Sequence, residues 1–482
     1  MGPALLVSDY FDIELTQPYL DFVDVDSTSD AKLYLDPTAL LTLNSSWASE
    51  CVALIQDFFQ RVVNHLANGN RDAACDLMEV LREPNETHLG VSVGKSRGRG
   101  LGRFKTYDIV DALETSGALD TGLLQDLEDT ILMVEGVGPD IVSDIATNII
   151  RVALIQYTQE MAEAYSIPLI PGVDSGSLWD PSQGRWFNEL THLPMTSAGK
   201  LLLVPKAIVR RRLAYSYDNY YWHFILPYLQ DAEIQSKSSL VRVLKSGEHR
   251  VSKNDLVDKY GRGKRFVVEQ TKQHPEILQK YREQKRGHPE GALSHAELAG
   301  DSHSALPNWP ELLAALSDIP PGSGMASQYH LAIMKILSAL FYPCLVTPRK
   351  EREINEGRKR IDIVFVNAAT DGFFQWVSKH YPAPNILVEC KNYSADPANP
   401  ELDQLSGRFS PSRGKIGLLM CRNFEDKELF IQRCRDTAND QQGFIVPLDD
   451  DDLRSLVEAG AEYGYESRQF QLLNERFNRL IM

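Results

Sequence analysis

The chain has 482 residues, of which 43% are hydrophobic and 24% are charged, an ordinary globular mixture that excludes wholesale disorder. At one domain per ~150 residues, this length predicts about three domains. No run approaches the ~18 apolar residues of a membrane span, and the N-terminus lacks the basic start of a secretory signal, so we expect no membrane contact. The six cysteines are scattered without a C-x-x-C pair, which predicts reduced thiols in a cytoplasmic protein.

The net charge of −16 is unevenly distributed along the chain. Residues 1–235 carry 16 Lys and Arg against 33 Asp and Glu, whereas residues 236–290 carry 14 against 7. An acidic protein does not coat nucleic acid indiscriminately, because phosphate contacts need local positive charge. We therefore expect DNA contacts in the basic segment, including Lys264 and Arg265. The alternative is a solvated surface without a ligand.

The first half is predicted to be a mostly helical α+β region. Apolar residues three and four apart predict helices over 46–68, 122–133 and 139–164, and the run at 201–205 predicts a strand. The segment 284–325 is rich in Gly, Pro, His and Ser, as linkers are. We therefore divide the chain into an acidic sensing or interaction region (1–235), a basic segment with a linker (236–324) and a C-terminal domain (325–482).

The C-terminal domain alternates helix and strand patterns. A buried amphipathic helix is expected at 327–341, with apolar strands at 361–366, 386–390 and 416–421 and helical patterns at 371–380, 400–409 and 424–438. Apolar strands alternating with helices predict an α/β domain whose sheet is covered on both faces.

Three charged residues on two of these strands need an explanation. Asp362 begins one strand, and the next strand carries Glu389 and Lys391 two positions apart, so both side chains point to one face while Cys390 points to the other. Burying such charges without partners is costly. Two carboxylates on adjacent strands are suited to a hard divalent cation such as Mg²⁺, which can activate a water near a phosphate.

The order of helix, Asp strand, Glu-x-Lys strand, helix and further strand resembles the PD-(D/E)XK nuclease superfamily over about residues 325–447. The resemblance implies a restriction-endonuclease-like fold, a mixed sheet flanked by helices. It implies that Asp362, Glu389 and the backbone carbonyl of Cys390 bind Mg²⁺, with Mn²⁺ able to replace it, and that Lys391 assists the attacking water. Gln404, on the following helix, matches a supporting polar position of Mrr-like and RecB-like members.

This sequence departs from the family pattern in several places. Ile361 stands where a proline is usual, and an extra helix interrupts the hairpin between Asp362 and Glu389. Residues 327–341 hold no acid, but His330 lies there and is a candidate additional metal ligand; the alternative is a histidine simply accommodated by the helix. The cluster Arg358, Lys359 and Arg360, just before Asp362, is a candidate DNA contact or a solvated group of charges.

The run GVSVGKS at 90–96 imitates a phosphate-binding loop. It has three residues between its glycines where the motif has four, and no apolar strand precedes it, so we expect no ATP hydrolysis.

These observations predict a cytoplasmic, Mg²⁺-dependent deoxyribonuclease, an endonuclease of the restriction or anti-phage defence type, acting as a homo-oligomer or with a partner defence protein. The defence role is analogy with the family. Three alternatives stay open at this point. The chain could be a repair or recombination nuclease, an inactive nuclease-fold protein that binds nucleic acid, or an acidic scaffold with an incidental Glu-x-Lys.

Overall fold

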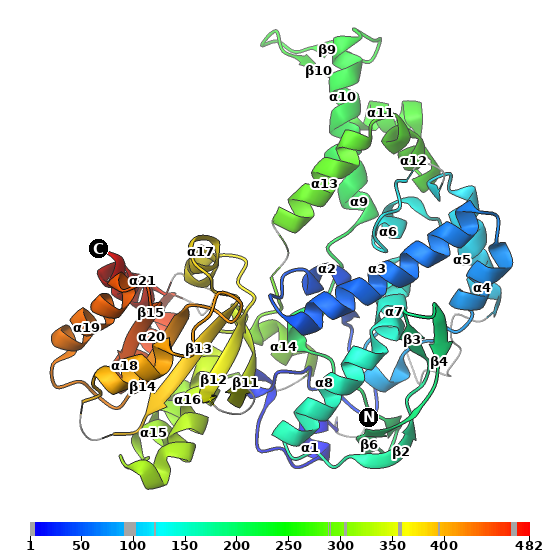
Figure 1. Cartoon of the computed structure of the whole chain (residues 1–482). Coiled ribbons are helices and arrows are strands. Elements are labelled where there is room, and N and C mark those ends of the chain that lie inside the picture. The colour runs from blue at the N-terminus through cyan, green and yellow to red at the C-terminus, as the bar shows by residue number, and fades with distance from the viewer. Residues whose placement is uncertain are drawn as a thin grey trace.

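Two large hydrophobic cores organise the chain. In the computed structural model, which describes residues 5–90, 103–119, 122–287, 289, 291–302, 306–354, 359–393, 396–463 and 470–482, each core lies in its own lobe (Figure 1). The first core takes its residues from Val7 to Leu298, with Tyr342, Val346 and Val366 added from further along the chain. The second runs from Leu316 to Leu480, and Trp309 packs against it.

The N-terminal lobe is a helical assembly. Its longest helix, α3, begins after Ser45, whose side chain accepts a hydrogen bond from the amide of Ala48, and buries an apolar stripe that includes Phe58 and Val62. The helices of this lobe are α1 (Val7–Tyr10), α2 (Pro37–Leu40), α3 (Ser46–Ala67), α4 (Arg71–Met78), α5 (Arg103–Thr115), α6 (Asp129–Met133), α7 (Pro139–Ile149), α8 (Arg151–Ala164), α9 (Tyr217–Tyr220), α10 (Leu226–Gln235), α11 (Lys253–Tyr260), α12 (Lys264–Gln273), α13 (Pro275–Gly287) and α14 (His295–Ser302).

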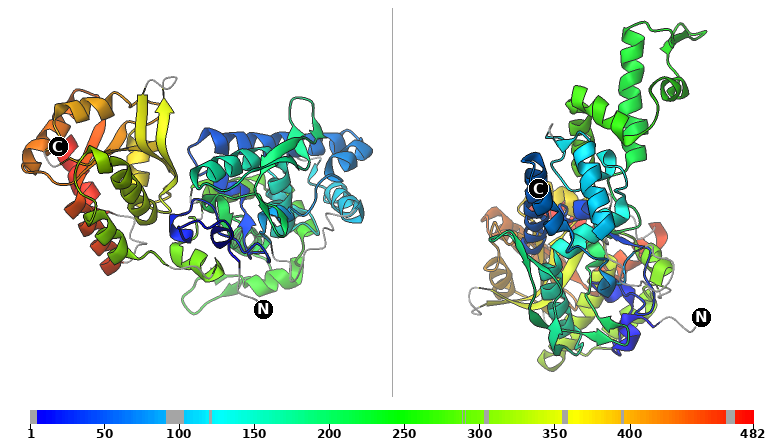
Figure 2. Two further views of the ribbon diagram at one scale, coloured as in Figure 1. Left: turned by 90° about the horizontal axis from the view of Figure 1, so that it is seen from below. Right: turned by 90° about the vertical axis from the view of Figure 1, so that its right-hand side faces the viewer.

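Short antiparallel pairs complete this lobe. They are β1 (Tyr34–Leu35) with β8 (Val209–Arg210), β2 (Ile170–Asp174) with β5 (Leu190–Leu193), β3 (Leu178–Asp180) with β4 (Arg185–Phe187), β6 (Met195–Thr196) with β7 (Gly199–Lys200), and β9 (Arg242–Val243) with β10 (His249–Arg250). Helix α10 and the β9–β10 hairpin project from the lobe as an arm (Figures 1 and 2).

The C-terminal lobe is built on one five-stranded sheet in the order β11-β12-β13-β14-β15. Strands β11, β12 and β13 are antiparallel neighbours, whereas β13, β14 and β15 are parallel. The sheet is therefore mixed, with β13 at the change of direction. The strands are β11 (Leu345–Ile354), β12 (Lys359–Asn367), β13 (Asn385–Lys391), β14 (Ile416–Cys421) and β15 (Phe444–Asp449).

Two groups of helices flank this sheet, and every residue of β14 is buried, as in a sheet covered on both faces. Helices α16 and α20 each pack against α15, while α19 packs against both α18 and α21. Helix α17 connects β12 to β13. The helices are α15 (Trp309–Ser317), α16 (Ala326–Leu340), α17 (Gly372–His380), α18 (Asn399–Ser406), α19 (Lys427–Asn439), α20 (Asp450–Tyr463) and α21 (Gln471–Ile481).

The two lobes contact each other through buried groups. The amide of Thr347 donates to Asp21 Oδ1 at 2.8 Å, and His295 Nε2 lies 2.9 Å from the carbonyl oxygen of Ala339. The ammonium of Lys206 lies 4.2 Å from the ring centroid of Tyr342. The C-terminal lobe is therefore packed against its neighbour rather than tethered to it.

The structure departs from the sequence-based expectations at several places. The helix expected over 139–164 is divided at Ile150 into α7 and α8. The run 201–205 is buried but forms no extended strand; its one bridge joins Pro205 to Phe22. Of the range 122–133, which was expected to be helical, only Asp129–Met133 forms a helix, α6. The basic segment belongs to the first core, and α15 belongs to the second, so the change of core falls between Leu298 and Trp309 rather than near residue 324.

Within the described part of the chain, no helix is both long enough and apolar enough to cross a membrane.

Candidate active site

Asp362 and Glu389 lie on neighbouring strands at the end of their shared ladder. The terminal pair of the β12–β13 ladder is Ile363 with Val388, so the same register places Asp362 opposite Glu389. Directly opposed residues of an antiparallel pair share one face of the sheet. The backbone amide of Cys390 donates to Asp362 Oδ2 at 2.9 Å, which fixes this carboxylate against β13.

Glu389 is the centre of a buried polar network. Its Oε1 lies 2.9 Å from Lys391 Nζ and 2.6 Å from Gln404 Nε2, and its Oε2 lies 2.5 Å from Arg408 Nη1. Lys391 Nζ also donates to Gln404 Oε1 at 3.0 Å. The structure thus brings together three of the predicted residues, Glu389, Lys391 and Gln404, and adds Arg408.

The two carboxylates influence each other electrostatically. Burial, followed by the negative charge of Asp362, raises the pKa of Glu389, although Lys391 and Arg408 oppose this. Burial alone would lower the pKa of Lys391, but the charge and hydrogen bond of Glu389 raise it overall. Lys391 is therefore held in its charged ammonium form. It lies beside two carboxylates that repel each other, and a nearby positive charge reduces that repulsion.

The residue that follows β13, Asn392, is held in place by a second set of hydrogen bonds. The side-chain amide of Asn392 donates to the carbonyl oxygens of Pro320 and Gly322, both at 3.0 Å. Gly322 returns a backbone hydrogen bond to the carbonyl oxygen of Asn392 at 2.7 Å. These bonds hold the residue after Lys391 against the loop that precedes α16.

His330, on α16, lies beside Asp362. Its Nε2 is 3.8 Å from Asp362 Oδ2, which is too long for a hydrogen bond, and both side chains are largely buried. His330 is thus close enough to approach an ion held by Asp362.

The donor set suits a hard divalent cation with few protein ligands. Among the described residues, no group of three or more His, Cys, Asp or Glu side chains is placed to hold a metal ion. A Mg²⁺ ion at the position expected from the sequence would instead meet the carboxylates of Asp362 and Glu389 and the carbonyl of Cys390, with waters completing the shell. Mg²⁺ commonly binds through one or two carboxylates and keeps several waters, so the residues present fit this ion.

The candidate DNA-contacting residues have different surroundings. Arg358 and the side chain of Lys359 lie outside the described residues, as do residues 91–96 of the loop-like motif, whereas Arg360 is exposed on β12. Lys264 Nζ donates to the carbonyl oxygens of Val134 and Val137 at 2.8 Å and 2.7 Å, so its charge serves an internal contact. Arg265 is exposed, with its guanidinium 3.9 Å from Glu269.

Sequence reasoning missed Arg408. This residue lies two positions beyond the end of α18 and four positions after Gln404; in the helix expected over 400–409, that spacing would place both side chains on one face. The same spacing, with a basic residue on the face of a predicted site glutamine, is the signal in the sequence that could have identified it.

Comparison with known proteins adds one finding. Residues 12–216 match a family described as a domain of unknown function (DUF8370). No curated protein and no solved structure matches the chain. The matched range lies within the N-terminal lobe, so the sheet that carries Asp362 and Glu389 falls outside this family similarity.

Proposed function

We propose that this chain is a Mg²⁺-dependent nuclease that hydrolyses phosphodiester bonds of DNA, with a PD-(D/E)XK active site in its C-terminal lobe. The observation that carries the proposal is that Asp362 lies opposite Glu389 on two adjacent strands, with Lys391 two positions further along the second strand. A buried ammonium beside two interacting carboxylates has a direct use in phosphate chemistry, because it can orient a water and offset negative charge.

Each residue has a role in this proposal. Asp362 and Glu389 would hold the divalent ion, which when bound would supply Lewis acidity at the scissile phosphate and make a nearby water more acidic. Lys391, raised in pKa by Glu389, remains charged near neutral pH and orients the attacking water. Gln404 holds both Glu389 and Lys391, so it positions the two groups that do the chemistry.

The sheet topology supports the assignment. A mixed sheet with antiparallel β11–β12–β13 followed by parallel β14 and β15, flanked by helices, is the architecture that the family resemblance implies. The arm carries exposed cations at Lys245 and Arg250, which are the groups that we expect to contact DNA phosphates.

The biological setting follows by analogy with the family. We place the chain among cytoplasmic restriction or anti-phage defence endonucleases, working as a homo-oligomer or with a partner defence protein, because cutting both strands is easiest with paired active sites. A repair or recombination nuclease would use the same residues, and comparing cleavage of linear, nicked and branched DNA separates these roles.

The direct test is cleavage of plasmid DNA by the purified full chain in Mg²⁺ and in Mn²⁺. We expect Lys391→Ala and Glu389→Gln to lower the cleavage rate at least ~100-fold, as loss of a charge-stabilising group does. Asp403→Asn is the matched control, because Asp403 is exposed on the same helix as Gln404. Circular dichroism checks that each variant folds. Unchanged cleavage in both site variants would contradict the proposal.

One observation favours a second candidate, a nuclease-fold protein that binds nucleic acid without cutting it. The guanidinium of Arg408 already occupies Glu389 Oε2, and a cation at that oxygen competes with a metal ion. The inactive protein would shift DNA in a gel without cleaving it in any divalent metal. In the active enzyme, Arg408→Gln would instead lower the Mg²⁺ concentration needed for half-maximal cleavage.

A further inference from the structure

A cavity of about 680 Å³ lies between the two lobes, away from the candidate active site. One side is formed by the N-terminal lobe, from α2 and α3, residues 126–128 and the end of α13. The other side is formed by residues 369–370 and α17 of the C-terminal lobe. This volume falls in the ~300–1,000 Å³ range of small-molecule sites and is too small for a nucleic acid duplex.

The N-terminal wall carries a buried carboxyl group. Glu128 is only 6% exposed, and Thr38 Oγ1 donates to its Oε1 at 3.0 Å. Burial, together with the charges of Asp36 and Asp126, raises the pKa of Glu128 to about 8. Near neutral pH this group is therefore mainly a neutral acid, which offers one hydrogen-bond donor and one acceptor.

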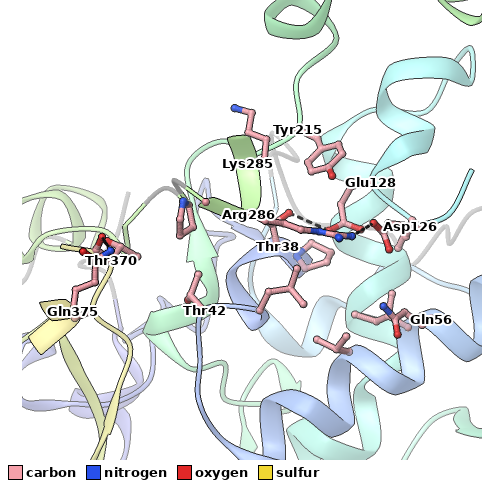
Figure 3. Close-up of a pocket in the computed structure, with 18 of the residues that line it drawn as sticks. Thr38, Thr42, Gln56, Asp126, Glu128, Tyr215, Lys285, Arg286, Thr370 and Gln375 are labelled. Atoms are coloured by element: carbon pink, nitrogen blue, oxygen red, sulfur yellow. Dashed lines mark hydrogen bonds and ion pairs between the residues drawn. The ribbon is translucent and has the colours of Figure 1, made fainter. Parts of the chain in front are cut away.

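An aromatic ring and an ion pair lie beside Glu128. Figure 3 shows Tyr215, Glu128 and the pair of Arg286 with Asp126 gathered on one wall, with Thr370 and Gln375 across the cavity. Arg286 Nη2 donates to Asp126 Oδ2 at 2.8 Å, so this carboxylate of the cavity wall already has a cationic partner.

Two lysines give the cavity an excess of positive charge. Lys285 lines it from α13 and Lys379 from α17, so one comes from each lobe. Within the part of the chain that the structure describes, neither lysine forms an ion pair; the ammonium of Lys285 lies 5.4 Å from the ring centroid of Tyr281. An anionic ligand would be attracted by both lobes at once.

We propose that this interlobe cavity binds a small phosphorylated ligand of nucleotide size, a mononucleotide or dinucleotide, with its heterocycle against Glu128 and Tyr215 and its phosphate near Lys285 and Lys379. The donor and acceptor of a neutral carboxyl group match the edge of a nucleobase. Lysine ammonium groups are common phosphate ligands. The site stands independently of the nuclease proposal, because it shares no residue with the active site.

The test is ligand binding by the full chain, measured by calorimetric titration and by thermal shift. The probes are adenine and guanine mononucleotides, linear and cyclic dinucleotides, and pyrophosphate as a phosphate without a base. The variants are Lys379→Glu, which reverses one charge, and Thr370→Trp, which fills the cavity. Lys280→Glu is the matched control, because Lys280 is exposed on α13 but does not line the cavity.

We expect at least one nucleotide to bind and to raise the melting temperature. Lys379→Glu should weaken its binding about tenfold or more, the loss of roughly one charged contact, while Lys280→Glu leaves it unchanged. Thr370→Trp should abolish it. The proposal is overturned if no probe binds with a dissociation constant below about 1 mM, which corresponds to a binding free energy of about −4.1 kcal/mol. It is also overturned if pyrophosphate binds as tightly as every nucleotide, or if binding survives both cavity variants.

Discussion

Two buried glutamates show how local partners decide the state of a carboxyl group. Glu389 contacts Lys391 and Arg408 within hydrogen-bonding distance, so it has the cations that a buried carboxylate needs. Among the side chains that the structure describes, only the hydroxyl of Thr38 forms a hydrogen bond with Glu128, and the neighbours that act on its charge are acidic. The cations beside Glu389 favour its charged form, whereas the burial and the acidic neighbours of Glu128 favour its neutral form.

The neutral state of Glu128 predicts a pH dependence of stability. Its pKa is about 8 in the folded chain against an ordinary value of 4.5, so between these values the folded state holds a proton that the unfolded state releases. This contribution to the free energy of unfolding is present below pH 4.5 and is lost as pH rises to about 8. Urea unfolding should therefore show a steeper loss of stability over this window in the wild type than in Glu128→Gln. Equal slopes in the two proteins would contradict the assignment.

At the level of elements, the sequence predicted best the segments whose periodicity is strong. The patterns at 46–68, 327–341 and 386–390 correspond to α3, α16 and β13, because each buries a regular face. Strand β11 was not predicted, since its sequence LVTPRKEREI contains a proline and five charges. It forms because an edge strand needs only one paired neighbour, here β12.

The candidate site was predictable in part for the same reason. Alternation along a strand is enough to place Glu389 and Lys391 on one face, and the family order suggested Asp362 and Gln404. The pairing of β12 with β13 in the register that opposes Asp362 and Glu389 depends on the connection through α17, which local patterns do not specify. The interlobe cavity depends on tertiary packing between distant segments, so no local sequence pattern predicts it.

Helix α21 completes the second core through an aromatic cluster. The ring of Phe477 is fully buried, and its centroid lies 5.2 Å from those of both Tyr381 and Phe444. Phe477→Ala should lower the free energy of unfolding by ~3–5 kcal/mol, because it leaves a cavity that the core cannot close. Leu429→Ala, at a position 44% exposed on α19, is the control and should change it by less than ~0.5 kcal/mol. Urea denaturation measures both, and equal effects would show that α21 is not part of the core.

On the scale of the whole molecule, the contact between lobes is part of a core. Tyr342 is 4% exposed and belongs to the first core, although the chain places it between α16 and β11 of the second lobe. Burying apolar surface from both lobes together favours unfolding as one unit.

We therefore expect a single calorimetric transition for the wild-type chain and two for Tyr342→Ala. Removing this ring should cost ~3–5 kcal/mol, as for other buried aromatic side chains, and should uncouple the lobes. Arg349→Ala is the control, because it removes only the partly exposed ion pair with Glu160, which contributes ~0–1 kcal/mol. A single unshifted transition in Tyr342→Ala would show that the lobes are coupled elsewhere.

The segment that joins β12 to β13 and contains α17 takes part in two features of the structure. The same connection ends at the strand of Asp362 on one side and at the strand of Glu389 on the other, and its middle forms a wall of the interlobe cavity. Helix α17 is anchored in the second core through Phe373, Phe374 and Val377, so this wall of the cavity moves together with the lobe that carries both carboxylates.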